Sequence, residues 1–447
     1  MFSRSAALTV SVFLTLSCAS KPPVPQASRP TPENDPIAGA VVLRPCLTIV
    51  LDHYFDGIRE LRGGAKFIVE NGVLATSSPN EATCTTLDLR SKSVIPGLID
   101  SHTHVMLTDK SYGTDFEKEL ERDAKRTNEE RLAEARLHLR SLLRSGFTTI
   151  RDLGNSGRFN DVVLKQEKGS FPRLFVSGPG LAFGTGQFSP KAPKALVEKE
   201  YRILRKPEDA ARFVAENATL GVDLVKVYAD NDPQKELITP ELLKAVIAAA
   251  RRQSFRVTAH ASFDSSARLA AEAGADSIEH GYELSKETLA IMKKKKIILV
   301  PTDYGIETCQ QISKRDPRPD FHPCSNYRKN QSKRLLAARN LGVEIAFGSD
   351  AYLELESPLD DRGRQTVDSL LALIEEGLTP IQALRAATSS GAHVLGRNDL
   401  GVITPGARAD LVAYAEDPIK NPKALMAPVL VIKDGVIVCG HDQEKCN

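Results

Sequence analysis

The sequence has almost no net charge, because 59 lysine and arginine residues stand against 57 aspartate and glutamate residues. A protein that binds nucleic acid or an anionic surface by electrostatics usually carries an excess of positive charge. The near balance therefore gives no reason to expect nucleic acid as a partner. With 447 residues, the chain is long enough for one large catalytic domain and a smaller accessory domain.

The N-terminal region lacks an apolar run of the length that crosses a membrane, which is about 20 residues. Its apolar run at residues 6–16 is shorter, follows a positively charged start and precedes small residues. This order is typical of a secretory signal. We therefore assign residues 1–20 to a signal peptide and expect the protein to be exported.

Cys18 lies in a pattern similar to the lipobox of bacterial lipoproteins, with Thr15 where that motif usually has leucine. Lipidation of Cys18 predicts a periplasmic or outer-membrane-anchored lipoprotein, whereas ordinary signal cleavage after Ala19 predicts a secreted protein. We favour the lipid anchor. Residues 21–40 are rich in proline and polar residues and have no apolar periodicity, which predicts an extended tether.

The cysteines show no spacing typical of a zinc-binding thiol cluster. Seven are present, and all except Cys18 remain for a mature protein that is expected to enter an oxidising compartment. The sequence alone does not fix how they pair. Proximity along the chain favours three disulfides, which are Cys46–Cys84, Cys309–Cys324 and Cys439–Cys446.

Short apolar segments separated by glycine, asparagine and proline predict a β-rich region at each end of the chain. These regions are residues 41–92 and 405–447, and we expect them to meet in one small, discontinuous β-sandwich. Residues 93–404 alternate short apolar strands with helical stretches, an order that predicts a parallel sheet. Eight such strands, the last at residues 344–347, favour an α/β fold closed into a (β/α)8 TIM barrel.

Six ionisable residues lie at the carboxyl ends of these predicted strands. His102 and His104 follow the first strand, and the strand period of two points both imidazoles to the same side. The others are Lys226, His260, His280 and Asp350, which end the fourth, fifth, sixth and eighth predicted strands. Active sites of barrels lie at this end of the strands, so we expect the six side chains to converge. Imidazole and oxygen ligands suit zinc.

The stretch Pro96-Gly-Leu-Ile-Asp-x-His-x-His104, with the single lysine, histidines and aspartate that follow, resembles the binuclear amidohydrolase superfamily. Residues 146–154, 260–281 and 405–412 resemble its prolidase-like and imidazolonepropionase-like branch. The resemblance implies two divalent metal ions, with zinc as the expected metal. It also implies that CO2 carbamylates Lys226, which turns a repelling ammonium into a carbamate with two oxygens that bridge the ions.

The ligand sets follow from the same resemblance. His102, His104 and Asp350 are implied to hold one ion, and His260 and His280 the second. Asp350 is also implied to accept the proton of the attacking water and to pass it to the leaving nitrogen. This transfer matters because an amine anion is a poor leaving group.

Members of this branch cleave dipeptides or N-acyl amino acids, so the resemblance implies hydrolysis of an amide bond in an Xaa-Pro, Xaa-basic or N-acyl substrate. Arg151 and Tyr228 are candidate contacts for the substrate's carboxylate. The alternatives are an ion pair between Arg151 and Asp152, and a tyrosine packed in the barrel. Family members commonly carry a histidine after the third strand, where this chain has Gln187, which donates hydrogen bonds but cannot become cationic.

Three other functions remain as alternatives. Hydrolysis of a cyclic amide or lactone would use the same activated water. A mononuclear deaminase would share His102 and His104, but it typically lacks the lysine at position 226 and has a glutamate shortly after the fifth-strand histidine, where this chain has Ala261. A non-catalytic binding protein on the same fold commonly loses metal ligands, whereas all six positions are filled here.

Two further segments and the assembly state are left open by the sequence. Residues 308–333 form either a disulfide-tied lid or a solvated loop. Residues 110–126 are highly charged and form either a helix or a loop beside the mouth of the barrel. The expected partner is a small-molecule or dipeptide substrate, and assembly into a homo-oligomer is compatible with the sequence.

Overall fold

The computed structural model describes residues 46–78, 81–111, 115–231, 235–315, 324–440 and 446. All the described residues belong to one compact unit. The predicted signal peptide, the candidate lipidation site Cys18 and the tether lie outside the described residues. Within the described part of the chain, no helix has both the length and the apolar character needed to span a membrane.

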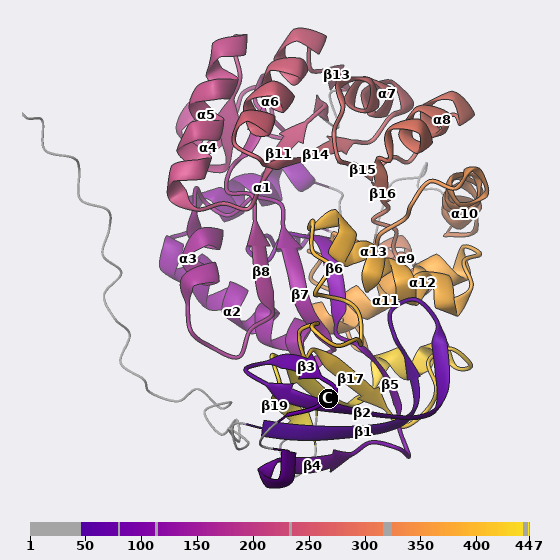
Figure 1. Cartoon of the computed structure of the whole chain (residues 1–447). Helices are drawn as coiled ribbons and strands as arrows, with labels where there is room; N and C mark the ends of the chain where they lie inside the picture. The colour runs from indigo at the N-terminus through magenta and orange to yellow at the C-terminus, as the bar shows by residue number, and fades with distance from the viewer. Residues whose placement is uncertain are drawn as a thin grey trace, which may run out of the picture. The chain divides into compact units, whose positions relative to one another are not determined.

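Strands from both ends of the chain join in one eight-stranded sheet (Figure 1). Its members are β1 (Cys46–Phe55), β2 (Glu60–Glu70), β3 (Val73–Ala75), β4 (Thr85–Asp88), β5 (Ser93–Pro96), β17 (Leu411–Tyr414), β18 (Pro428–Lys433) and β19 (Val436–Gly440). The order is β19-β18-β17-β5-β1-β2-β3, and β4 also pairs with β1. The antiparallel pair β17–β5 joins the two chain ends. The strands thus form a single sheet in the described residues, and the expected sandwich is not confirmed.

The core of this sheet follows from the alternation of apolar residues in β1. Leu47, Ile49 and Leu51 are buried, and they pack in one cluster with Leu411 and Ile432 from the other end of the chain. Side chains alternate between the two faces of a strand, so this spacing places all three on one face. Burial of each such side chain contributes roughly 1.5–3 kcal/mol, and this holds the two ends together.

Three disulfides are present, and they are the pairs that proximity along the chain favours. Cys46–Cys84 joins the start of β1 to the turn before β4. Cys309–Cys324 joins two helices, and Cys439–Cys446 ties residue 446 to β19.

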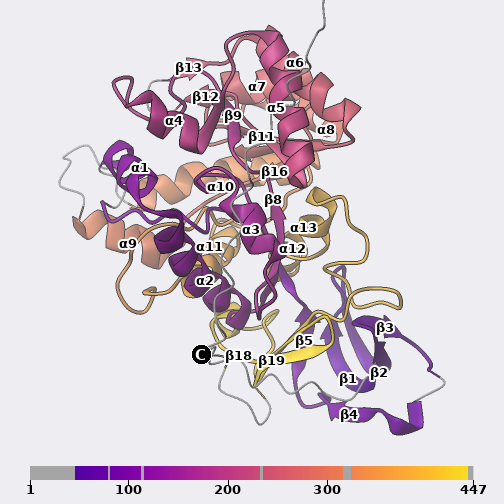
Figure 2. The same cartoon turned by 90° about the vertical axis from the view of Figure 1, so that its left-hand side faces the viewer.

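The residues between these ends form parallel strands surrounded by helices (Figure 2). One sheet contains β6 (Leu98–Thr103), β7 (Phe147–Asp152) and β8 (Arg173–Val176). A second contains, in spatial order, β10 (Tyr201–Ile203), β9 (Gly180–Ala182), β11 (Leu224–Tyr228), β14 (Arg256–Ala261), β15 (Ser277–His280) and β16 (Ile298–Val300). All pairings in both sheets are parallel. A small antiparallel pair, β12 (Asp230–Asn231) and β13 (Glu236–Leu237), follows β11.

The prediction of an eighth strand at residues 344–347 is wrong, because this segment forms only an isolated β-bridge. The backbone of this segment bonds Leu299 of β16 on one side, and Ser101 of β6 donates to the carbonyl of Phe347. The amides of Ile99 and Phe347, however, donate to the carbonyls of Ala387 and Ala386. Backbone groups that are already satisfied by this neighbouring turn cannot form a continuous ladder. The strands therefore surround a common interior as in a TIM-barrel-type fold but do not close into a ring.

The helices are α1 (Phe116–Lys125), α2 (Asn128–Arg144), α3 (Asn160–Gln166), α4 (Lys194–Glu200), α5 (Pro207–Leu220), α6 (Pro240–Arg252), α7 (Asp264–Ala273), α8 (Lys286–Lys295), α9 (Ile306–Arg315), α10 (Cys324–Leu341), α11 (Arg362–Glu375), α12 (Pro380–Ala386) and α13 (Ser389–Val394), with short 3-10 helices at Glu81–Thr83 and Pro422–Met426. Local sequence explains where several of them begin. Thr127 and Glu130 form a capping box at the start of α2, which satisfies backbone amides that have no partner within the helix. Proline at the first turn starts α5, α6 and α12.

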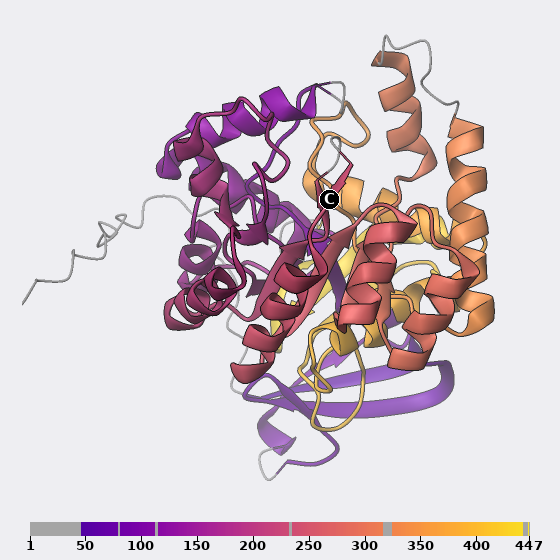
Figure 3. The same ribbon diagram turned by 90° about the horizontal axis from the view of Figure 1, so that it is seen from above.

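Helices α9 and α10 occupy most of the predicted insertion at residues 308–333. Figure 3, a view from above, shows them side by side, and α9 also packs against α11. The described part of this insertion is therefore helical and not a solvated loop. The charged segment at residues 110–126 is likewise mainly helical, as α1.

Candidate metal centre and active site

The six residues predicted to bind metal lie around one cavity. His104, Lys226, His260, His280 and Asp350 line it, and His102 contacts Asp350 and His280 at its side. The histidines lie near or just after the ends of parallel strands, Lys226 lies within β11, and Asp350 lies in the loop after the segment that bridges β16 and β6. The structure thus brings together residues that are far apart in the sequence.

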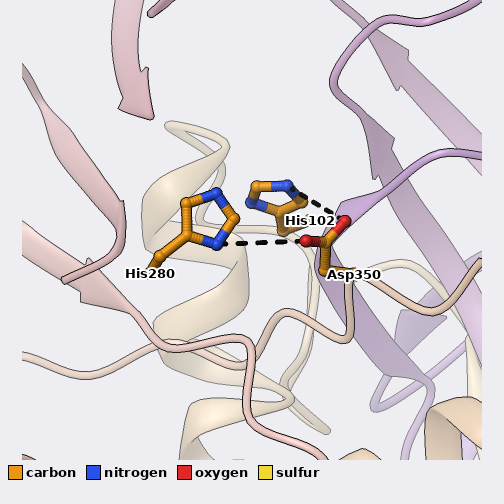
Figure 4. A group of neighbouring side chains, drawn as sticks. All are labelled: His102, His280 and Asp350. Atoms are coloured by element: carbon orange, nitrogen blue, oxygen red, sulfur yellow. Dashed lines mark ion pairs between the residues drawn. The ribbon is translucent and has the colours of Figure 1, made fainter. Parts of the chain in front are cut away.

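The distances between the nitrogen and oxygen atoms of these side chains are short enough for several of them to bind the same metal ion. Nε2 of His102 and Nε2 of His104 lie 3.6 Å and 3.5 Å from Oδ1 of Asp350. Nδ1 of His280 lies 3.9 Å from Oδ2 of the same carboxylate. Figure 4 shows both His102 and His280 facing Asp350. The His260 and His280 rings are 4.5 Å apart between centroids, which extends the cluster towards β14.

Unpartnered polar atoms show that this donor set fits a metal ion. Nε2 of His102 and Oδ1 of Asp350 are buried and make no hydrogen bond. A buried polar atom without a partner costs about 1–3 kcal/mol, so two that face each other need an explanation. Burial lowers the pKa of His102 and of His280 well below the usual histidine value, and that of His104 to about 3. All three imidazoles are therefore neutral and offer lone pairs to a divalent cation.

Hydrogen bonds on the far side of two rings orient their lone pairs. Nδ1 of His102 donates to Oε2 of Glu279 over 2.7 Å, and Nδ1 of His104 donates to the carbonyl of Gly154 over 2.9 Å. Each bond fixes the proton on Nδ1 and leaves Nε2 as the free acceptor. His260 differs, because its Nε2 lies 3.1 Å from Oδ1 of Asp230, which is also a buried oxygen without a hydrogen bond.

Glu279 and Arg151 form a buried ion pair beneath the histidines. Nη2 of Arg151 donates to Oε1 of Glu279 over 2.9 Å, and the hydroxyl of Ser277 donates to the same oxygen over 2.7 Å. The hydroxyl of Thr258 also donates to this carboxylate. The side chain of Arg151 is 3% exposed and does not line the cavity. Its position favours a role in orienting His102 through Glu279. Asp152, the alternative partner considered from the sequence, instead accepts hydrogen bonds from backbone amides.

The sequence analysis did not assign Glu279 a role, although one signal was present. Glu279 is an acidic residue inside a short strand whose residues are all buried. A buried carboxylate requires a cation or several donors, so its sequence context alone indicated a structural partner. Alternation along β15 would place Glu279 and His280 on opposite faces. The backbone of His280 has a φ of 69°, and this turn at the strand end allows both side chains to serve the same site.

Asp350 is also held by an unusual backbone, with a φ of 47°. Non-glycine residues in the left-handed region cost of order 1–3 kcal/mol and are found preferentially at functional sites. Asp100 holds this loop, because its Oδ1 accepts the amides of His102 and Ser349 over 3.1 Å and 3.0 Å. Gly348 permits a close approach, since a Cβ atom there would lie 2.6 Å from Cβ of His102. The aspartate is thus fixed before any ligand binds.

Lys226 is almost completely buried, with 1% of the residue exposed, and its side chain lines the cavity. Among the described residues, no carboxylate lies within ion-pair distance of its Nζ, which is 5.2 Å from the centre of the Tyr228 ring. Burial lowers the pKa of Lys226 to about 8. A buried lysine with a lowered pKa has a larger fraction of neutral amine, which is the nucleophilic form.

The rest of the cavity wall is formed by neutral polar groups and apolar side chains. The hydroxyl of Tyr228 donates to Oδ1 of Asn155 over 3.4 Å, and Nδ2 of Asn155 donates to the hydroxyl of Tyr201 over 3.3 Å. The hydroxyl of Tyr201 then donates to Oε1 of Gln187 over 3.2 Å. Among the described residues, the amide protons of Gln187 have no hydrogen-bond acceptor. The sequence analysis missed Asn155 and the apolar lining residues Leu107, Phe116 and Tyr352, all of which lie on loops or at a helix start.

Comparisons with known proteins find similarity over most of the chain. A model of the amidohydrolase family matches residues 93–438. An uncharacterized protein of Mycobacterium tuberculosis is 31% identical over 350 residues, which are 76% of this chain and 84% of that protein. Ochratoxinase of Aspergillus niger is 26% identical over 366 residues, 76% of this chain and 73% of that enzyme. The solved structure of a Xaa-Pro dipeptidase with methionine bound in its active site is 25% identical, with a TM-score of 0.73, and the match covers 88% of this chain and 99% of that chain.

Proposed function

The chain belongs to the amidohydrolase family, and we propose that it is a metal-dependent hydrolase that cleaves the amide bond of a dipeptide or an N-acyl amino acid. One observation carries this proposal. Buried, unpartnered atoms of His102 and Asp350 face each other in a cavity that also contains Lys226, His260 and His280. A non-catalytic protein would gain nothing from keeping these atoms without partners.

The proposed metal centre uses the donors described above. His102, His104 and Asp350 would hold one divalent cation, and His260 and His280 a second, with zinc as the expected metal. A carbamate formed from CO2 and Lys226 would supply further oxygen ligands to this centre. When bound, the two cations would supply Lewis acidity for the scissile carbonyl and lower the pKa of the attacking water.

The chain's own residues would carry the proton. Asp350 is the proposed acceptor of the proton of the attacking water and would deliver it to the leaving nitrogen, a transfer that contributes about 10² to 10⁴ to the rate. Glu279 holds His102 in the correct tautomer, and Arg151 holds Glu279. The proposed role of Arg151 is therefore positioning, not contact with the substrate.

The proposed substrate site is formed by the remaining wall of the same cavity. Gln187, Asn155 and Tyr228 offer neutral hydrogen-bonding groups, and Phe116 and Leu107 offer apolar contact. A dipeptide or N-acyl amino acid carries amide, carboxylate and apolar groups that match such a wall. The name of one relative, ochratoxinase, and that of a neighbouring structure, Xaa-Pro dipeptidase, point to different substrates, so the side chain preferred by this protein is a matter for experiment.

The test is metal analysis of the purified protein, followed by assay of dipeptides and N-acyl amino acids with and without a chelator. We expect two equivalents of divalent metal and release of an amino acid that stops when the chelator is added. Readdition of zinc should restore the rate. A protein that takes up no metal and releases nothing from the library would contradict the proposal and favour a binding protein on this fold.

A second experiment examines how the substrate is held. Replacing Gln187 by leucine removes its free amide donors, so we expect KM to rise about tenfold, equivalent to one lost hydrogen bond of about 1.4 kcal/mol, with little change in kcat. Gln253→Leu is the matched control, because Gln253 is exposed at the end of α6 and should leave KM unchanged. An unaltered KM in Gln187→Leu would place the substrate elsewhere in the cavity.

A further inference from the structure

A second cavity lies outside the catalytic one, between α4, β10, α5 and the loop after β7. Its volume is about 300 Å³. It is lined by Arg158, Glu198, Tyr201, Arg202, Ile203, Arg205, Arg212 and Phe213. Four guanidinium groups therefore face one carboxylate in a cavity of the size that binds small molecules.

Two of the arginines already have carboxylate partners that do not line the cavity. Arg202 makes a bidentate pair with Glu216, at 3.0 Å from Nε and 2.8 Å from Nη2, and its side chain is only 14% exposed. Arg212 pairs with Asp209 at 2.6 Å and lies 4.4 Å from the centre of the Phe213 ring, but its side chain is 65% exposed. The pair of Arg202 and Glu216 thus fixes one part of the cavity wall before a ligand arrives.

The positive charges of the other two arginines are not fully compensated by carboxylates. Nη2 of Arg205 lies 3.6 Å from Glu198, a loose contact for a side chain that is 59% exposed. No carboxylate among the described residues lies within ion-pair distance of Arg158. A loose surface pair contributes little by itself, so both guanidinium groups are available to a stronger anionic partner.

The backbone of Arg158 adds an independent observation. Its φ is 79°, in a region that long side chains rarely adopt. The hydroxyl of Ser156 donates to the carbonyl of Arg158 over 3.1 Å. The amide of Gly157 donates to Glu200 over 3.0 Å, and Glu200 is itself paired with the buried Arg131 at 2.5 Å. A strained conformation that is held so firmly, at the edge of a cavity, is typical of a functional site.

We propose that this cavity binds a small molecule carrying a multiply charged oxyanion, either a phosphate group or a dicarboxylate. The planar guanidinium group matches the oxygens of both anions with two parallel hydrogen bonds. Phe213 and Ile203 provide apolar contact for the organic part of such a molecule. Glu198 is the one lining group that opposes the anion.

The position of Tyr201 links this cavity to the catalytic one. Tyr201 lines this second cavity, and its hydroxyl donates to Gln187 on the wall of the catalytic cavity. Asn155 and Arg158 also belong to the same loop after β7. A bound anion would thus lie near a buried residue that is one hydrogen bond away from the proposed substrate site.

The test is isothermal titration of the metal-loaded protein with inorganic phosphate and, separately, with succinate, in a buffer that contains neither. We expect saturable binding of at least one probe, and the probe that binds identifies the class of anion. The double variant Arg158→Asn, Arg205→Gln should bind at least about tenfold more weakly, since hydrogen bonds to charged groups contribute about 1.5–3 kcal/mol. Asparagine is chosen at position 158 because it tolerates a positive φ.

Three further variants exclude other causes. Glu198→Gln should bind more tightly, because it removes the opposing charge. The control double variant Arg59→Gln, Arg90→Gln removes the same charge from exposed turns outside the cavity and should bind like the wild type. Asp350→Asn should also retain binding, which separates this cavity from an anion held at the metal centre. The proposal fails if neither probe binds, if the two double variants weaken binding equally, or if Asp350→Asn abolishes it.

Discussion

Replacing Asp350 by asparagine is expected to lower kcat by about 10³-fold or more, because the variant loses the proposed proton acceptor and one charged metal ligand in a single step. The fold should survive this change. Asparagine has nearly the same shape and tolerates the φ of 47° at this position. Burial raises the pKa of Asp350 to about 7, so a neutral amide costs the metal-free protein little.

Thermal unfolding, metal content and kcat measured on the same preparations separate these effects. Asp360→Asn is the matched control, since Asp360 lies ten residues further along the chain, is exposed and pairs only with Arg364 among the described residues. We expect the control to keep the wild-type rate. A folded Asp350→Asn variant that retains more than about a tenth of the wild-type kcat would remove Asp350 from the proposed proton transfer.

The convergence of the metal ligands could be predicted from sequence because two simple regularities apply to them. Short apolar strands in a βαβα order place their carboxyl ends together. His102 and His260 lie next to such ends, and Lys226 lies within β11, two residues before its last residue. The family resemblance drawn from the same residues is confirmed by the family match over residues 93–438. This part of the site could be predicted without knowing which residues far apart in the sequence contact each other.

The residues that hold the proposed metal ligands in place could not be predicted in the same way. Arg151 was considered with Asp152, its neighbour in sequence, but adjacent residues of a strand point to opposite faces. Its partner is Glu279, 128 residues away, and that pairing depends on how β7 and β15 face each other across the interior. The positive φ of His280, which brings Glu279 and His280 to the same site, has no signature in the sequence.

The segment at residues 344–347 shows a related limit. Its apolar pattern is that of a short buried strand, but whether such a segment joins a ladder depends on which carbonyls reach its amides. The last residue of α12, Ala386, provides the carbonyl for the amide of Phe347, and this competes with strand pairing. Likewise, Asn155 adopts a φ of 56° in a loop, and only the resulting conformation brings its side chain to the cavity.

Replacing Lys226 by methionine is expected to remove most of the bound metal and to lower kcat by about 10³-fold or more, since the site would lose the anionic oxygen ligand that a carbamate on Lys226 would supply. Methionine has a similar length and no charge, so burial of the side chain becomes less costly and the strand should remain intact. Lys244→Met, on the exposed face of α6, is the matched control and should keep full activity.

The carbamate itself makes a sharper prediction than the substitution. Metal-stripped wild-type protein that is reloaded with zinc in CO2-depleted buffer should regain little activity, and bicarbonate should then restore it, because an ammonium at Lys226 repels the cations that a carbamate binds. Lys226→Met should not respond to bicarbonate at all. If the wild type takes up zinc equally well with and without bicarbonate, Lys226 does not act as a carbamate. The metals would then depend on the histidines and Asp350 alone, and the loss of activity in Lys226→Met would have to arise from substrate binding beside Tyr228.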